Sequence, residues 1–257
     1  TIEKYVQKFN FQTPFVFNLD ETRTQPRATS DIRMACPELV EARKLWLRET
    51  DLRTSLCVVA ADGKVWMTLY IYMNSATSDS ARKSRSGGLP VYYNAHQTRS
   101  TWPTLYARTK RGFMTQELFT LVLNRLVDLV NPHRSDIPIL VFSDRPACHD
   151  NAQMLDDLWG HDCHIVWFPH SSTQIVQPLD GESYMKLKSG TKTKLIDRQL
   201  SCALTGESTR YMIADIAPEA EREELTREVV KRSFVDRGIW PFNPEKIAQK
   251  FGTHEKY

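Results

Sequence analysis

The sequence has no run of eighteen consecutive apolar residues, so it has no segment of the kind that crosses a membrane as a helix. Its first ten residues, TIEKYVQKFN, have neither the apolar core of a secretory signal nor a starting methionine. We therefore expect no membrane partner, and we expect the chain to be a piece of a longer protein.

Cysteine is scarce as well. The five cysteines are odd in number and show no C-x-x-C spacing, which argues against a disulfide framework and against a zinc ribbon. This pattern favours a reducing compartment.

The excess of positive charge is also small, at +3, and cannot by itself indicate a nucleic-acid partner. With 257 residues, 41% of them hydrophobic, the chain can form one large domain, or one domain with an extension.

Four stretches of the sequence predict β-strands. In TPFVFNLDET, residues 13–22, Phe15, Phe17 and Leu19 alternate with residues of the opposite face, and Asp20 lies at the strand's end. A β-hairpin follows in residues 55–73, where Asp62-Gly63 joins two apolar runs. The continuous apolar run IPILVFSD predicts a central strand that ends at Asp144, and CHIVWFPH, residues 163–170, predicts another.

Helical patterns separate and follow these strands. Residues 115–131 show helical spacing of apolar positions, with Thr115 as the N-cap and Pro132 beyond the end. A shorter helix is expected in residues 149–160, with Gly160 as its stop, and the chain from about residue 182 onward is mostly helical. Residues 24–54 are interpreted as an insertion, and residues 74–111 as irregular loop around a short strand near LPVYY.

The aspartate that ends STQIVQPLD, residues 172–180, has two interpretations. A lone Asp after Pro-Leu is most simply a helix N-cap, because its carboxylate accepts from the free N–H groups of the next turn. Alternatively, Asp180 is one corner of a charged site. In a ribonuclease H-like sheet the first and fourth strands are neighbours, so Asp20 and Asp144 would meet and Asp180 would complete the cluster. Three adjacent carboxylates need a compensating cation, and oxygen ligands suit Mg²⁺ or Mn²⁺.

Six segments together resemble the DDE-superfamily endonuclease domain of pogo/Tigger/Jerky-type transposases, a group that includes centromere protein B. They are FNLDET, VVAADGK, TKRGFMTQELF, ILVFSDRPACH, IVWFPHSSTQIVQPLD and SFVDRGIWPFNP. The resemblance implies an α/β, ribonuclease H-like fold: a mixed five-stranded sheet flanked by helices. It implies that Asp20, Asp144 and Asp180 are the catalytic metal ligands. We divide the chain into a catalytic core, residues 1–195, with insertions near 24–54 and 74–111, and a helical C-terminal extension, residues 196–257.

Other residues receive secondary roles. His149 matches a histidine of the family and is a candidate for touching substrate phosphate, although an exposed histidine at a helix start fits equally well. Arg145 departs from the family pattern and places a cation beside the proposed site, whereas Glu21 is expected to support Asp20 from the opposite face. Basic residues near the site are candidates for phosphate contacts or for a solvated surface: Lys186, Lys188, Lys192, Lys194, Arg108, Lys110 and Arg111.

The resemblance implies a transposase-type catalytic domain that cleaves DNA phosphodiester bonds and transfers strands with Mg²⁺ or Mn²⁺. The expected partner is DNA, either transposon ends or chromosomal DNA, with a second copy of the chain as a further candidate, and the expected location is the nucleus. The alternative from another class is a domesticated, non-cleaving module that serves as a DNA-bound or chromatin scaffold.

Overall fold

The computed structural model describes residues 8–23, 52–73, 92–93, 102–144, 152–169, 172–205 and 212–254. Most of the two predicted insertions, near 24–54 and 74–111, lies outside these ranges, as do Arg145 and His149. Asp20, Asp144 and Asp180 all lie inside them.

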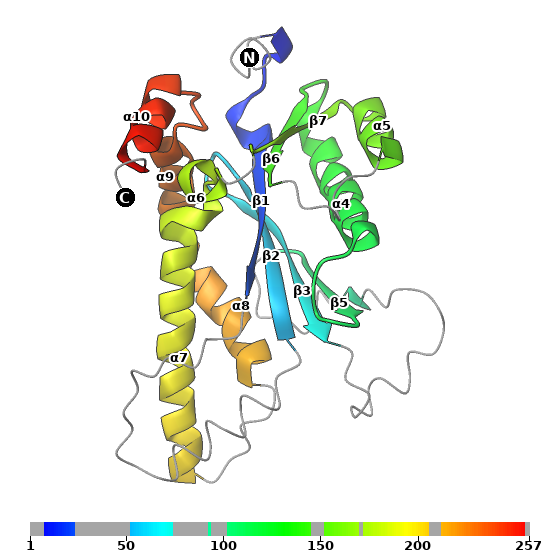
Figure 1. Cartoon of the computed structure of the whole chain (residues 1–257). Helices are drawn as coiled ribbons and strands as arrows, with labels where there is room; N and C mark the ends of the chain where they lie inside the picture. The colour runs from blue at the N-terminus through cyan, green and yellow to red at the C-terminus, as the bar shows by residue number, and fades with distance from the viewer. Residues whose placement is uncertain are drawn as a thin grey trace.

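A seven-stranded sheet forms the centre of the molecule (Figure 1), with the order β4-β5-β3-β2-β1-β6-β7. The strands are β1 (Val16–Arg23), β2 (Leu52–Ala60), β3 (Val65–Met73), β4 (Tyr92–Tyr93), β5 (Thr104–Thr109), β6 (Ile139–Ser143) and β7 (Cys163–Trp167). Strands β1, β2 and β3 pair antiparallel, whereas β6 is parallel to both β1 and β7. The five strands from β3 to β7 in this order are the predicted ribonuclease H-like sheet, and that fold class is confirmed.

Strands β5 and β4 extend the sheet beyond the predicted five strands. The short strand near LPVYY is present as β4, but β5 was missed in a segment interpreted as irregular loop. Strand β5 pairs with β3 in parallel from Thr104 to Thr109, and alternate residues such as Leu105 and Ala107 are buried. The pairing edge that β3 offers, rather than a strong local pattern, accounts for the strand.

The hairpin between β2 and β3 forms as predicted. Gly63 has φ of +93°, a conformation that glycine adopts without steric cost, and its N–H donates to the carbonyl of Ala60 at 2.9 Å. A Cβ at this position would also collide with the backbone of Arg227, so the turn needs glycine for space as well.

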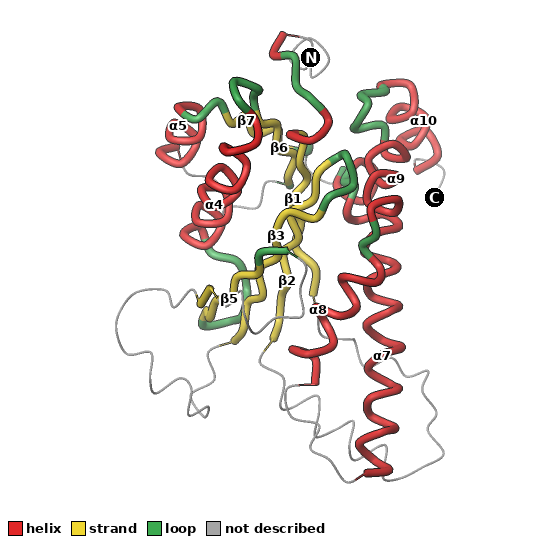
Figure 2. The backbone as a smooth tube through the Cα atoms, turned by 180° about the vertical axis from the view of Figure 1, so that it is seen from behind, coloured by secondary structure: helices red, strands yellow, loops and turns green. Residues whose placement is uncertain are grey.

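Helices cover both faces of the sheet (Figures 1 and 2). Helices α4 (Gln116–Arg134) and α5 (Ala152–Gly160) lie on one side. The other side carries α6 (Thr173–Val176), the π-helical turn η3 (Leu179–Ser183), α7 (Tyr184–Thr205), α8 (Met212–Glu224), α9 (Arg227–Arg237) and α10 (Pro244–His254). A short 3-10 turn, η1 (Thr13–Phe15), leads into β1.

Helix α4 confirms the predicted cap and corrects the predicted end. The side chain of Thr115 accepts from the backbone N–H of Leu118, as expected for the N-cap, and Glu117 lies in the first turn. Pro132, however, lies inside the helix, which continues to Arg134. Proline interrupts one backbone hydrogen bond, and near the end of a helix packed along the core this cost does not stop the last turn.

The alternation of β1 divides the apolar interior into two layers. Phe15, Phe17 and Leu19 pack in the layer beneath α4 and α5, whereas Val16 packs in the layer beneath the C-terminal helices. The second layer contains Val230 and Phe234 of α9, among others.

Helix α7 runs through position 195, and the proposed division of the chain into a core and a C-terminal extension at that position stays a prediction.

One buried polar group interrupts the second face. The carboxylate of Glu221, from α8, is almost completely buried against β2 and β3. It accepts hydrogen bonds from the hydroxyls of Tyr70 at 2.8 Å and Thr68 at 3.1 Å, and the thiol of Cys57 lies 3.9 Å away. Satisfied in this way, it ties α8 to the centre of the sheet.

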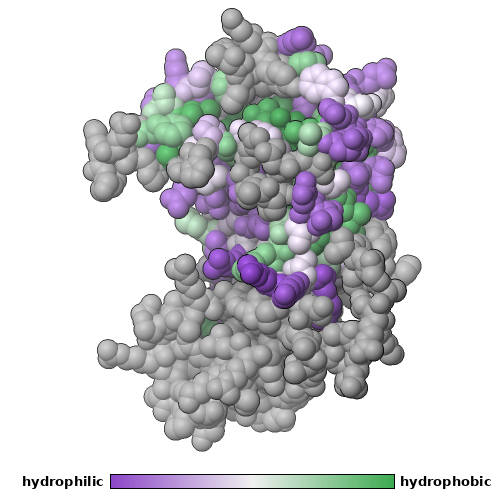
Figure 3. Space-filling view, turned by 45° about the vertical axis from the view of Figure 1, so that its right-hand side comes forward, coloured by the Kyte–Doolittle hydropathy of each residue, from purple (hydrophilic) through white to green (hydrophobic). Residues whose placement is uncertain are grey.

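The surface of the described part mixes polar and apolar side chains (Figure 3). The large exposed hydrophobic residues are Phe113, Trp159, Met185, Val235 and Phe251. Within the described ranges, no helix combines the length and the apolar character needed to traverse a membrane.

Candidate active site

Strand β1 brings Asp20 next to the end of β6. The two strands pair in parallel with Val16 opposite Leu140, Phe17 opposite Val141 and Asn18 opposite Phe142. Two residues beyond the last of these pairs come Asp20 in β1 and Asp144 just after β6. The predicted meeting of the first and fourth strands is therefore present in the sheet, although 124 positions separate the paired residues in the sequence.

The third aspartate lies in the turn between α6 and α7. Gln177 precedes a proline and is extended, with φ of −70° and ψ of 120°, so α6 ends at Val176. Pro178 then starts the π-helical turn η3, and Asp180 lies in its first turn. The cap position is Pro178, which offers no side-chain hydrogen bond, so the interpretation of Asp180 as an N-cap is wrong.

Asn18 joins the three segments that carry the aspartates. Its side-chain amide is fully buried and donates from Nδ2 to the carbonyl of Phe142 at 2.9 Å. Its Oδ1 accepts from the backbone N–H of Leu179 at 3.1 Å. Phe142 lies two residues before Asp144, and Leu179 lies one residue before Asp180. The alternation of β1 puts Asn18 on the same face as Asp20, but the sequence did not identify this function, because the partners of Asn18 are backbone atoms.

A second contact fixes Asp20 itself. The hydroxyl of Tyr184, at the start of α7, donates to the backbone carbonyl of Asp20 at 2.5 Å. Tyr184 is buried and lies four residues after Asp180. The segment that carries the third aspartate thus holds the backbone of the first, and sequence reasoning also missed this residue.

The electrostatics of Asp20 reflect both burial and its acidic neighbours. Burial raises the pKa of the Asp20 carboxyl well above its usual range, and the charges of Asp180 and Asp144 raise it further. A hydrogen bond from the backbone N–H of Glu21 opposes this rise, and Oδ2 of Asp20 is buried with no hydrogen-bond partner. The site therefore disfavours three simultaneous negative charges unless a cation compensates them.

The donor set fits a divalent cation in its chemistry. Three carboxylates offer the oxygen ligands that Mg²⁺ and Mn²⁺ prefer, and the unpartnered Oδ2 of Asp20 is a buried acceptor. Among the described residues, however, no group of three or more His, Cys, Asp or Glu side chains is arranged to hold a metal ion. The carboxylates are close enough to affect one another electrostatically, and they would have to move closer together to enclose an ion.

Sequence similarity identifies the family of the chain. The sequence model of the DDE superfamily endonuclease family matches residues 50–214, which include Asp144 and Asp180 and follow Asp20. The chain belongs to this family. No curated protein matches it in sequence.

Solved structures offer distant likenesses to this DDE superfamily endonuclease. The catalytic domain of Mos1 transposase with raltegravir and manganese has a TM-score of 0.41 at 9% identity, covering 91% of this chain and 88% of that one. The catalytic domain of Mos1 mariner transposase has a TM-score of 0.40 at 10% identity, covering 92% and 88%. The Mos1 paired-end complex with the left transposon end has a TM-score of 0.39 at 10% identity, covering 92% and 59%. At these values we transfer no residue roles.

The secondary residues of the endonuclease have different positions. Glu21 is half-buried and follows Asp20 in β1, pairing with Leu56 of β2. Its supporting role stays a prediction, with its backbone N–H as the contact to Asp20 that the structure describes. The proposed roles of Arg145 and His149 concern residues outside the described ranges.

The seven basic residues proposed for DNA binding come from two parts of the chain: four from α7, and Arg108, Lys110 and Arg111 from the end of β5 and the residues after it (Figures 1 and 2). The guanidinium of Arg108 lies over the ring of Tyr72 at 5.6 Å, and Tyr72 packs on the face of the sheet that α7 and α8 cover. Within α7, Lys188 and Lys192 are exposed, whereas Lys186 pairs with Glu182 at 2.9 Å. Lys194 pairs with Glu219 at 3.0 Å and Glu223 at 2.8 Å, and so it joins α7 to α8.

Proposed function

We propose that this DDE superfamily endonuclease is a transposase-type catalytic domain that cleaves DNA phosphodiester bonds and transfers strands with Mg²⁺ or Mn²⁺. The observation that carries the proposal is the grouping of three aspartates at one end of β1 and β6, where the charges of Asp144 and Asp180 both act on buried Asp20. Such a grouping of like charges has no use in packing, and its carboxylates are the oxygen ligands that a divalent-metal site uses.

Asp20, Asp144 and Asp180 would hold the metal ions. Bound divalent ions would activate a water or a 3′-hydroxyl and stabilise the leaving oxygen of a phosphodiester. Asn18 and Tyr184 keep the three carboxylate-bearing segments in register, through the contacts to Phe142, Leu179 and the Asp20 carbonyl.

The proposed partner is DNA, either transposon ends or chromosomal DNA, and the proposed location is the nucleus. Lys188 and Lys192 are exposed on α7, the helix that follows the η3 turn and Asp180, and they are the proposed phosphate contacts. Lysine side chains bind phosphates and release counterions, which gives affinity without sequence preference. A second copy of the chain as partner also stays a proposal.

A metal-dependent nicking assay on supercoiled plasmid tests the proposal. We expect nicking that requires Mg²⁺ or Mn²⁺ and that falls about 10³-fold or more in Asp20→Asn, Asp144→Asn and Asp180→Asn, since residues that act as a unit fail together. Double variants should lose little more than single ones. The matched control is Asp157→Asn, an exposed aspartate of α5 that accepts a hydrogen bond from Gln153.

Two results would count against the proposal. Nicking that persists in all three aspartate variants would place the chemistry elsewhere or assign it to a contaminant. Tight DNA binding with no nicking in either metal would favour the non-cleaving scaffold.

A further inference from the structure

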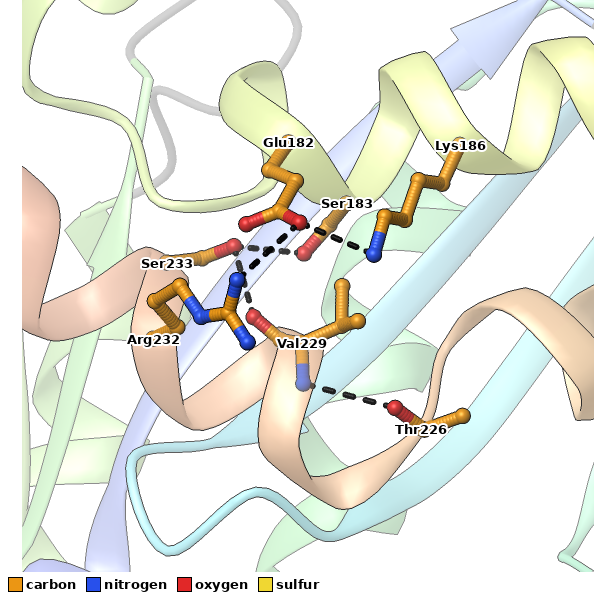
Figure 4. Close-up of polar contacts among 7 residues, drawn as sticks. All are labelled: Glu182, Ser183, Lys186, Thr226, Val229, Arg232 and Ser233. Carbon is orange, nitrogen blue, oxygen red and sulfur yellow. Dashed lines mark hydrogen bonds and ion pairs between the residues drawn. The ribbon is translucent and has the colours of Figure 1, made fainter.

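Helix α9 contacts the turn that carries Asp180 (Figure 4). The carboxylate of Glu182, two residues after Asp180, lies between Lys186 of α7 at 2.9 Å and Arg232 of α9 at 3.5 Å. The hydroxyls of Ser183 and Ser233 lie 2.7 Å apart, and both residues are buried. The η3 turn is thus attached to α9 by an ion pair at its surface and a hydrogen bond beneath.

Arg237, the last residue of α9, reaches the other end of the same segment. Its Nη1 donates to the carbonyls of Gln174 at 2.5 Å and Ile175 at 2.7 Å. These carbonyls belong to the four-residue helix α6, which is too short to satisfy its last carbonyls internally. Arg237 therefore provides the hydrogen bonds that close α6 immediately before Pro178 and Asp180.

The guanidinium of Arg237 also lies against the backbone next to Asp180. A Cβ built on Gly181 would lie 3.0 Å from Nη2 and 3.1 Å from Nε of Arg237. Any other residue after Asp180 would therefore crowd the guanidinium of Arg237, which would have to give way by a few tenths of an ångström.

The charge of Arg237 acts on the same aspartate. Burial lowers the pKa of the half-buried guanidinium, whereas the charges of Asp180 and Asp236 raise it, which shows that both carboxylates favour its charged form. Asp236 has a cation of its own, Lys246, at 3.6 Å.

We propose that Arg237 is a positioning residue for Asp180: its guanidinium ties α6 to α9 by hydrogen bonds and lies against Gly181, and in this way it fixes the turn that carries the carboxylate. This inference rests on the proposed function, because it assigns the SFVDRGIWPFNP segment to the active site. The C-terminal helices then serve the catalytic centre as well as the core.

The test combines metal binding and kinetics in Arg237→Met, with Arg227→Met as the matched control. Arg227 is on the same helix and also donates to a backbone carbonyl, that of Asp62, but at the β2–β3 turn. We expect Arg237→Met to weaken Mn²⁺ binding, measured by calorimetry, and to lower kcat, each about 10- to 100-fold, with KM for DNA unchanged. Arg237→Lys should restore part of the loss, and Arg227→Met should behave as the unmodified chain.

Gly181→Ala provides a second variant for the case in which Arg237→Met does not fold. Its added methyl pushes the guanidinium by a few tenths of an ångström, so we expect a smaller loss in the same direction. If Arg237→Met folds, Gly181→Ala should add nothing to it, because the methyl then has room. Gly160→Ala, whose Cβ would meet nothing within 4 Å, is the control.

Three results would overturn the inference. Unchanged Mn²⁺ affinity and kcat in Arg237→Met would do so directly, and a raised KM with unchanged kcat would make Arg237 a DNA contact. If the unmodified chain neither binds metal nor cuts DNA, the proposed function fails. In that case the inference is tested without metal, by the melting temperatures of Arg237→Met, Asp180→Asn and the double variant. If Arg237 positions Asp180, the two changes in melting temperature are not additive in the double variant, and additive changes would reject the inference.

Discussion

At the scale of single residues, Asn18 connects the three segments that carry the aspartates of the proposed site. Its amide uses one donor and one acceptor, and the two partners fix which way it points: a carbonyl at Phe142 and an N–H at Leu179. An aspartate or leucine of similar size could satisfy only one of these groups or neither. Asn18 therefore specifies the register of three segments in a way that no apolar side chain could.

Asn18→Ala should leave both buried backbone groups without a partner. We expect a loss of about 2–4 kcal/mol in the free energy of unfolding, since each unsatisfied buried group costs about 1–3 kcal/mol. Urea denaturation with a constant m-value measures this. The control Asn131→Ala removes an exposed amide that accepts from Arg134, and it should change stability by less than about 0.5 kcal/mol. Equal effects of the two variants would show that the Asn18 contacts contribute nothing specific.

Glu221 gives a prediction for pH. Burial raises the pKa of its carboxyl from 4.5 to about 7, although hydrogen bonds from Tyr70, Thr68 and Cys57 lower it. Because the folded chain then binds a proton that the unfolded chain has released, stability falls as pH rises from about 4.5 to about 7 and levels off above that.

Glu221→Gln should remove this part of the pH dependence. Each unit of pKa shift corresponds to about 1.4 kcal/mol, so between pH 5 and pH 8 the variant should gain about 2.5 kcal/mol relative to the unmodified chain. Urea unfolding at the two pH values measures the difference. Parallel pH profiles for the two proteins would mean that Glu221 ionises normally in the folded chain.

At the scale of elements, the strongest local patterns were predictive. The β2–β3 hairpin, helix α4 and strands β6 and β7 follow from Asp62-Gly63, from helical spacing and from uninterrupted apolar runs. Strand β5 could not be predicted in this way, because Thr104–Thr109 forms a strand by pairing with β3, a partner distant in sequence. The η3 turn is a similar case: Pro178 indicates a break, but the position of Asp180 depends on contacts with segments distant in sequence, namely Asn18 of β1 and the residues of α9.

Helix α7 carries two kinds of lysine: Lys188 and Lys192 are exposed, whereas Lys194 pairs with two carboxylates. This difference predicts that their substitution changes the salt dependence of DNA binding differently. Replacing exposed Lys188 and Lys192 by Gln should reduce the slope of log Kd for DNA against log salt by up to about two units, since each phosphate contact contributes about 0.9. Fluorescence anisotropy at several salt concentrations measures the slope.

Lys194→Gln is the matched control on the same helix. Its ammonium binds Glu219 and Glu223, so its loss should lower the melting temperature and leave the salt slope unchanged. A reduced slope in Lys194→Gln, or an unchanged slope in the Lys188/Lys192 double variant, would contradict this assignment.

At the scale of the whole molecule, the proposed site draws on segments from both ends of the chain. Asp20 comes from the first strand, Asp144 from the fourth in the predicted core, and Asp180 from a turn held by α9. That Asp20 and Asp144 follow neighbouring strands could be predicted, because the sequence resembles a family whose strands have a known order; the role of the three aspartates as metal ligands stays a prediction. The contacts that hold them could not, because Asn18, Tyr184 and Arg237 bind backbone carbonyls and N–H groups, which no sequence motif identifies.

The central claim is that these aspartates form one divalent-metal site, and calorimetric titration of Mn²⁺ tests it most directly. We expect the unmodified chain to bind Mn²⁺, and we expect Asp20→Asn, Asp144→Asn and Asp180→Asn each to weaken that binding at least tenfold, because every ligand contributes to one site. A melting temperature that rises with Mn²⁺ only in the unmodified chain would agree, since a ligand at about 100 times its Kd stabilises the folded state by about 2.7 kcal/mol. Equal Mn²⁺ binding by the unmodified chain and all three variants would contradict the account.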